Sequence, residues 1–179
     1  MQIEAKKPCW LALIGVMDNA ACGRLLVACN NAIAMGHDAL HLMIHSAGGF
    51  CADGIAMHNI LRAQPLPVTT YNIGSVASAA IWPYLGGTHR VCDATGVFLI
   101  HRPAGGPGGH GPAVQSALES LELDEARSRA LLQQHLALTA EQQAIYETRD
   151  LLISPQAALA AQLAHEIAPF SPSGQFFLI

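Results

Sequence analysis

The sequence has little charge and few aromatic residues, and it lacks any long uninterrupted apolar run. Only 12% of its 179 residues are charged and 6% are aromatic, whereas 51% are hydrophobic. The longest apolar runs, such as residues 10–17, contain fewer than ten residues, whereas about 20 are needed to span a membrane. We therefore predict one domain with no membrane span, whose excess apolar surface contacts other subunits.

Several further absences narrow the class of protein. The net charge is −4 and there is no cluster of Lys or Arg, so nucleic acid is not a predicted partner. Glu4 interrupts the opening segment, which therefore does not resemble a secretory leader, and we predict a cytoplasmic protein. No glycine-rich nucleotide-binding pattern lies between a strand and a helix, and no cofactor is predicted. The cysteines are odd in number and lack CxxC spacing, which favours free thiols; they are Cys9, Cys22, Cys29, Cys51 and Cys92.

Predicted strands and helices alternate along the chain, which is typical of an α/β domain. The pattern predicts strands over 10–14, 40–44, 68–73, 89–92 and 96–100, and helices over 19–35, 53–63 and 113–138. A capping box at Thr139 opens a helix that runs to about residue 149, and Ser154-Pro155 opens the last helix. Residues 1–9 are expected to form a short arm, and residues 168–179 an apolar tail that needs a surface to cover. A Pro/Gly tract over 103–112 is expected to form a substrate-facing loop.

Ser78 stands where the third predicted strand gives way to a helix. That strand is expected to end at Gly74, and small residues surround the hydroxyl in the segment Gly-Ser-Val-Ala-Ser-Ala-Ala. A serine at such a turn is either an ordinary helix N-cap or a nucleophile beside an oxyanion site. Its own neighbourhood favours the N-cap.

Acyl transfer by a serine also needs a base, a group that orients the base, and oxyanion donors. His101 follows a predicted strand and is the candidate base, and Asp150 follows a predicted helix and is the candidate orienting group. The backbone N–H groups of Gly49 and Ala79 are the candidate oxyanion donors. Taken singly, each residue is more often structural, and spacing alone does not bring them together.

These segments, taken in order, resemble the Clp protease proteolytic subunit. The motifs are Ile-His-Ser-Ala-Gly-Gly ending at Gly49, the segment around Ser78, Leu-Ile-His-Arg-Pro around His101, and Thr-Arg-Asp-Leu-Leu-Ile-Ser-Pro around Asp150. Gly49 precedes Ser78 by 29 residues and Asp150 follows His101 by 49, which are spacings expected of family members. The resemblance runs from about residue 10 to residue 167. Four ordered motifs favour a catalytic triad over the separate structural interpretations.

The resemblance implies a Clp/crotonase-like α/β fold, with repeated β-β-α units and a handle helix near 113–138. It further implies a serine endopeptidase that cleaves peptides or unfolded proteins inside a homo-oligomeric ring, heptameric or stacked in pairs. ATP would act only through a separate unfoldase partner. The implied catalytic residues are Ser78, His101 and Asp150, with the oxyanion held by Gly49 and Ala79. The implied substrate-binding residues are Gly48, Phe50, Pro103, Gly105 and Gly106.

Two other functions share this fold and stay open. One is a catalytically silent or regulatory ring subunit, and the other is a crotonase-type acyl-CoA enzyme, which would not need the three triad residues together. The chain also departs from the family pattern at Ala47, Ala79 and Thr148. A metal site at His37, His41 and His45 is a weaker alternative, because a spacing of four suits a helix rather than the strand predicted there. We predict no metal.

Overall fold

The computed structural model describes residues 7–105 and 111–179, and it is a mixed α/β structure as predicted. Strands and helices alternate up to β3, whereas β4 is followed directly by β5, and β7 by β8, with neither helix nor 3₁₀ turn between them. The strands are β1 (Pro8–Met17), β2 (Ala39–Gly49), β3 (Val68–Ala77), β4 (His89–Cys92), β5 (Val97–Ile100), β6 (Leu151–Ile153), β7 (Glu166–Ile167) and β8 (Phe176–Leu178). The helices are α1 (Asn19–Ala34), α2 (Cys51–Arg62), α3 (Ile81–Leu85), α4 (Pro112–His135), α5 (Ala140–Thr148) and α6 (Pro155–Ala160), and a 3₁₀ turn, Ser78–Ala80, precedes α3.

One sheet organises the described part of the chain. Its strand order is β6-β5-β3-β2-β1-β8, and β4 pairs with the first half of β3 while β5 pairs with the second half. All strand pairs are parallel except β5 with β6. Parallel strands are buried on both faces and therefore read as nearly continuous apolar runs, as β1 does over Cys9–Leu13. The carboxyl ends of β2, β3 and β5 meet at one edge of the sheet, where Ser78 and His101 follow β3 and β5.

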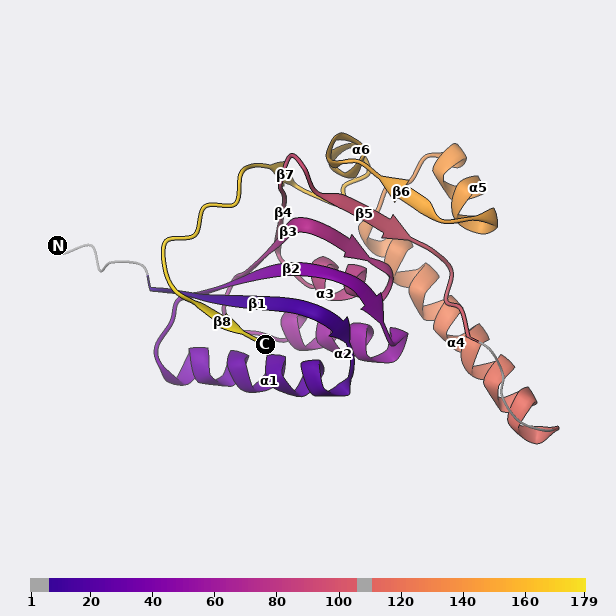
Figure 1. Ribbon diagram of the computed structural model, residues 1–179, viewed down its shortest axis with the longest axis horizontal. Helices are drawn as coiled ribbons and strands as arrows, with labels where there is room; N and C mark the ends of the chain where they lie inside the picture. The colour runs from indigo at the N-terminus through magenta and orange to yellow at the C-terminus, as the bar shows by residue number, and fades with distance from the viewer. Residues whose placement is uncertain (1–6, 106–110) are drawn as a thin grey trace.

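Helices α1 and α2 lie along the same face of the sheet (Figure 1). In α1 the buried positions are Ala21, Leu25, Cys29 and Ala32, whose spacing forms one stripe of the helix. The Asp18 side chain caps this helix by accepting a hydrogen bond from Ala21 N at 2.8 Å, which satisfies one of its unpaired N–H groups. The amphipathic pattern thus fixes which side of α1 packs on the sheet.

The second half of the chain is arranged differently. Helix α4 extends away from the sheet, while α5, β6 and α6 lie near the end of α4 that is beside the sheet (Figure 1). Only Ser128 and Leu132 are buried in α4, and Leu118 and Leu123 are exposed. No helix among residues 7–105 and 111–179 is both long enough and apolar enough to cross a membrane.

Several predicted boundaries were wrong. The strand predicted over 40–44 continues as β2 to Gly49, with a register shift opposite Gly15. Strand β3 continues past Gly74 to Ala77, and α4 ends at His135 because Leu136 is extended. β1 begins at Pro8, inside the predicted arm. Three strands were missed: β6, β7, which pairs with β4, and β8, by which the predicted tail pairs with β1.

Candidate active site

The turn at Ser78 holds its residue in an unusual backbone conformation. Ser78 has a φ of +55°, in the left-handed region that non-glycine residues rarely adopt and that costs about 1–3 kcal/mol. The 3₁₀ turn begins at Ser78 itself, and the N-cap position before it is Ala77, with no side-chain cap. The N-cap interpretation of Ser78 is therefore wrong. Its hydroxyl instead lies 2.7 Å from Nε2 of His101.

The glycine pair at the end of β2 packs against this turn. Gly48 has a φ of +106°, and a Cβ atom there would lie 2.6 Å from Cβ of Ser78 and 3.0 Å from N of Ala79. At Gly49 a Cβ would clash with the backbone oxygen of Met17. The hydroxyl of Ser46 fixes the same segment, because it donates to Gly15 O at 2.5 Å and accepts from Gly48 N at 2.9 Å. Only glycine at both positions allows β2 to approach the serine this closely.

His101 connects the serine to the loop that follows β5. Its Nδ1 lies 2.7 Å from the backbone oxygen of Arg102, and its Nε2 lies 2.7 Å from Ser78 Oγ. A carbonyl oxygen only accepts hydrogen bonds, so Nδ1 carries the proton and donates it. Nε2 of the neutral ring is then free to accept from the Ser78 hydroxyl. This is the tautomer that a general base requires.

Asp150 is exposed, and it is not a hydrogen-bond partner of His101. The strand register nevertheless places the two residues close together. In the antiparallel ladder of β5 with β6, Ile100 is opposite Leu151, so one further pair would set His101 opposite Asp150. Directly opposed residues on one face have Cβ atoms about 4.5–5.5 Å apart. The predicted His101–Asp150 bond is absent, but the ladder ends one pair short of it.

A cavity of about 190 Å³ opens beside Ser78. Of the predicted substrate-binding residues, Phe50 and Pro103 line it, Gly48 packs behind the serine, and Gly105 lies in open space. Gly106 lies outside the described residues. The cavity is lined by Gly49, Phe50, Cys51, Ser78, Ala79, Trp82, His101, Pro103, Ala104, Leu121, Asp124 and Ser128. The predicted oxyanion residues Gly49 and Ala79 thus border the same space as Ser78.

Ion pairs attach the loop after His101 to α4 and α5. Arg102 binds Glu125 at 2.6 Å, and Arg129 bridges Glu125, at 3.0 Å, and Glu147. Hydrogen bonds from Arg102 and Arg129 lower the pKa of Glu125, and a hydrogen bond from Arg129 lowers that of Glu147. Single exposed pairs contribute little, but a network of shared charges holds one geometry. It positions the carbonyl of Arg102 that binds His101.

The three histidines considered as metal ligands have other partners. His41 stacks on Trp10 with ring centroids 4.3 Å apart and bonds the Tyr71 hydroxyl at 2.7 Å. His45 accepts from Ser75 N at 3.1 Å, and His37 bonds the backbone oxygen of Lys7. Within residues 7–105 and 111–179, no group of three His, Cys, Asp or Glu residues is arranged to hold a metal ion. All five cysteines are free thiols, as predicted.

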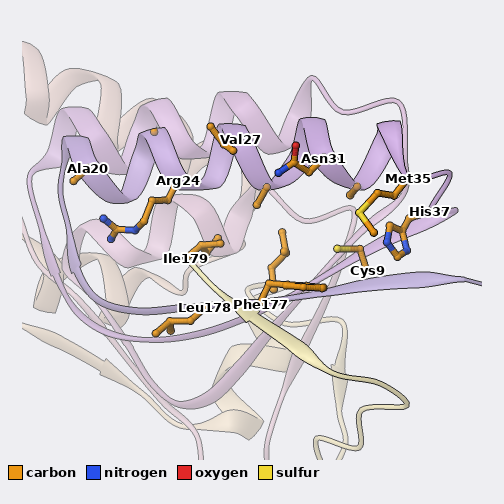
Figure 2. A pocket seen from close by; sticks show the side chains of 14 residues that line it. Cys9, Ala20, Arg24, Val27, Asn31, Met35, His37, Phe177, Leu178 and Ile179 are labelled. Atoms are coloured by element: carbon orange, nitrogen blue, oxygen red, sulfur yellow. The ribbon is translucent and has the colours of Figure 1, made fainter.

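A larger cavity, of about 640 Å³, lies elsewhere, between α1 and β8 (Figure 2). Val27 of α1 and Met35, just after α1, lie on one side of it, and Phe177 and Leu178 of β8 on the other. Arg24, Asn31 and His37 are its most polar lining residues. It shares no residue with the Ser78 cavity, and no hydroxyl or carboxylate side chain lines it. The smaller cavity is therefore the candidate active site, despite its size.

Sequence reasoning missed the α4 side of the site. Leu121, Asp124 and Ser128 are spaced by three and four residues, so they share one face of α4, and that face borders the cavity. This spacing is visible in the sequence, but α4 was interpreted only as a handle between subunits. The carbonyl of Arg102 was also missed, because a backbone group leaves no signal in the residue types.

The described geometry defines a class: an α/β protein with a serine on a strained turn, hydrogen-bonded to a histidine at the carboxyl end of the sheet. The sequence profile of the Clp protease family matches residues 17–169. Because this match covers most of the chain, the protein belongs to the Clp protease family. The predicted resemblance and fold class are confirmed.

Individual relatives are distant. The chain is 30% identical over 146 residues to the ATP-dependent Clp protease proteolytic subunit 3 of Rhodococcus jostii, which covers 78% of this chain and 71% of that one. It is 26% identical over 121 residues to proteolytic subunit 2 of Corynebacterium glutamicum, which covers 66% of this chain and only 60% of that relative. A ClpP1 mutant from Listeria monocytogenes has a similar fold, with a TM-score of 0.78, 20% identity and 91% coverage of both chains.

Proposed function

We propose that this protein is a serine endopeptidase that hydrolyses peptides or unfolded proteins. The observation that carries this proposal is the 2.7 Å contact between Ser78 Oγ and His101 Nε2, with Nδ1 bound to a carbonyl. A serine that lies within hydrogen-bond reach of an oriented base is the arrangement that activates a hydroxyl for acyl transfer. Membership of the Clp protease family supports the same reaction class.

In the proposed reaction, Ser78 Oγ attacks the peptide carbonyl carbon while His101 Nε2 accepts the hydroxyl proton. The backbone N–H groups of Gly49 and Ala79 stabilise the oxyanion of the tetrahedral intermediate, and losing one such donor typically costs about 10²–10³ in rate. His101 then protonates the leaving amine, and the acyl-enzyme is hydrolysed by water that His101 activates. These steps need no metal or organic cofactor.

Asp150 is proposed as the group that stabilises the charged histidine. The carbonyl of Arg102 already fixes the tautomer of His101, but it carries no full charge to offset the imidazolium. A carboxylate does so, as in serine proteases with a complete triad. We propose that one further residue pair between β5 and β6 brings Asp150 to Nδ1 during turnover, guided by the register of Ile100 with Leu151.

The assembly and partners of the protein are also proposals. The exposed apolar residues of α4, Leu118 and Leu123, fit a handle that contacts another subunit, in a homo-oligomeric ring that is heptameric or stacked in pairs. A separate ATP-driven unfoldase would feed unfolded protein to the ring. We place the protein in the cytoplasm, where its five free cysteines would stay reduced. Light scattering tests the ring, since a particle of 18.9 kDa would be a monomer.

Labelling with a serine-reactive fluorophosphonate tests the chemistry directly. We expect an adduct at Ser78, mapped by mass spectrometry, and none in the His101→Ala variant, because the serine then lacks its base. Peptide hydrolysis should disappear in parallel. If Ser78 stays unlabelled while the protein is folded, the peptidase proposal fails.

One observation favours a second candidate, a catalytically silent or regulatory subunit of a ring. Nδ1 of His101 binds its neighbour's carbonyl rather than Asp150, which is an incomplete triad. A silent subunit would assemble normally yet resist labelling and hydrolyse no peptide. An acyl-CoA enzyme of the crotonase type has no need of the bond between Ser78 and His101 and is not favoured.

A further inference from the structure

The α4 side of the Ser78 cavity has its own chemistry. Leu121, Asp124 and Ser128 line the space beside the serine together with Cys51 and Trp82. Ser128 is fully buried, and its hydroxyl lies 3.4 Å from the Cys51 thiol. The Ser128 hydroxyl and the Cys51 thiol therefore form a polar part of the cavity lining, while Leu121 and Trp82 supply apolar surface. Such a mixed lining selects among side chains rather than accepting any apolar group.

Asp124 places a carboxylate on this wall. Its side chain is 22% exposed, and it pairs through Oδ1 with Arg127, which is itself 44% exposed and does not line the cavity. Oδ2 has no partner among the residues that the structure describes. The charge also acts inside the cavity: burial is the main cause of the raised pKa of the Cys51 thiol, and Asp124 adds to it. One acceptor oxygen thus stays available to a ligand in the cavity.

The size of the cavity limits what it takes. At about 190 Å³ it is smaller than the 300–1,000 Å³ typical of pockets for whole small molecules. It fits one side chain of a bound peptide. A lysine or arginine suits the lining, because its aliphatic stem packs on apolar walls while its charged end reaches a carboxylate. A glutamate there would meet a like charge in a partly enclosed space.

We propose that Asp124 is a specificity-determining residue, which selects lysine or arginine as the substrate residue on the amino side of the scissile bond. This inference rests on the proposed peptidase function of Ser78. It adds a substrate class that neither the Ser78–His101 pair nor the family match defines. Arg127 shares the carboxylate, so the selection is graded rather than absolute.

The test uses fluorogenic peptides that differ only in the residue before the cleaved bond: lysine, norleucine, which keeps the stem without the charge, and glutamate. We expect kcat/KM to be highest for lysine, and about tenfold lower for norleucine, because a charge-assisted hydrogen bond is lost. Glutamate should be cleaved least. Equal or faster cleavage of the norleucine peptide overturns the role of Asp124.

Two variants of α4 separate this role from a general effect of charge. Asp124→Asn keeps the shape of the side chain and should remove the lysine preference, so that the ratio of kcat/KM for the lysine peptide to that for the norleucine peptide falls to about one. Glu122→Gln removes an exposed carboxylate of the same helix that does not line the cavity, and it should keep the preference. A lysine preference that survives in Asp124→Asn contradicts the proposal.

The same peptides tell the two proposals apart. Cleavage that persists in Ser78→Ala, or no cleavage of any peptide by the assembled protein, defeats the peptidase function and the specificity with it. Cleavage that depends on Ser78 but ignores the charge of the substrate residue defeats only the role of Asp124. Thermal unfolding of Asp124→Asn beside the parent chain shows whether loss of folding explains a lost preference.

Discussion

The two ring nitrogens of His101 face two differently built regions. On the Nε2 side, β2, β3 and the Ser78 turn are packed so closely that Gly48 has no room for a Cβ atom. On the Nδ1 side, the antiparallel ladder between β5 and β6 has stopped, and Asp150 is exposed. The parallel centre of the sheet is buried, whereas its antiparallel edge has only three residue pairs. Ser78 and His101 are therefore held together at the carboxyl ends of packed parallel strands, whereas Asp150 adjoins a short edge strand.

Removal of the serine hydroxyl is the strongest test of the closely packed Nε2 side of His101. We expect Ser78→Ala to lower kcat/KM by about 10⁶, as in other serine peptidases that lose their nucleophile. The fold should survive, because alanine keeps the Cβ atom of Ser78 and removes only the hydroxyl group. Residual hydrolysis at the level of the parent chain would show that another residue is the nucleophile.

Two separate glycine-to-alanine variants test the close packing behind the serine. Gly48→Ala should lower kcat/KM by about 10²–10³, because its Cβ displaces Ser78 and the segment that carries Ala79 N. Gly15→Ala is the matched control, since Gly15 also has a φ of +106° but would meet nothing within 4 Å. Both variants carry similar backbone strain, and only the first should lose activity. A comparable loss in the two would point to strain rather than contact.

The open side is tested by Asp150→Asn. Because the Arg102 carbonyl already fixes the tautomer, we expect a loss of about 10²-fold in kcat, smaller than the roughly 10⁴-fold loss of triads that depend on the carboxylate for both tasks. Glu141→Gln, at an exposed position of α5, should have no effect. Single-turnover kinetics give the measurement, and a loss of 10⁴ would show that the carbonyl contact is not the working arrangement.

The smallest expected effect is a pH dependence of the free energy of unfolding that arises from His135, at the end of α4. Nε2 of His135 is buried with no partner among the described residues, and its ring lies 5.3 Å from that of His58. Burial, and then the charges of His58, Arg90 and Arg62, lower the pKa of His135 to about 4. Between pH 6.5 and 4 the unfolded chain thus binds a proton that the folded chain does not, so the free energy of unfolding falls as the pH falls.

Because solvent screens this partly exposed ring, we expect a loss of about 1–2 kcal/mol between pH 7 and pH 5, and not the full shift. Denaturant unfolding at the two pH values provides the measurement. His135→Gln should flatten the pH dependence, and His37→Gln, at an exposed hydrogen bond, should leave it unchanged. An equal slope in parent and His135→Gln would rule out this histidine as the cause.

Most of the fold followed from local patterns in the sequence. The stripe of α1, the capping box at Thr139 and the Ser154-Pro155 start of α6 each placed a helix correctly. The missed strands β6, β7 and β8 contain two or three residues each, too few to show a period. The predicted strand stopped short of the glycines at the end of β2, because their pairing with Val16 and Met17 depends on a distant strand.

The site was predicted in part for the same reason. Ser78, His101 and the glycine pair lie at strand ends, and the order of strands in a parallel sheet brings such ends together. Nδ1 binds the carbonyl of the next residue rather than the predicted carboxylate of Asp150, and this difference depends on geometry finer than any motif. Predicting the α4 residues that line the cavity requires the position of α4 relative to the sheet, which local sequence patterns do not contain.

The antiparallel pairing of β5 with β6 is short and could lengthen by one residue pair. Three residue pairs are formed, and a fourth would join His101 to Asp150 across the strands. If Asp150 is the third member of the triad, as we propose, activity depends on whether this fourth pair forms. A contact that pulled the start of β6 toward β5, from a neighbouring subunit or an extended peptide, would then complete the proposed triad without moving Ser78.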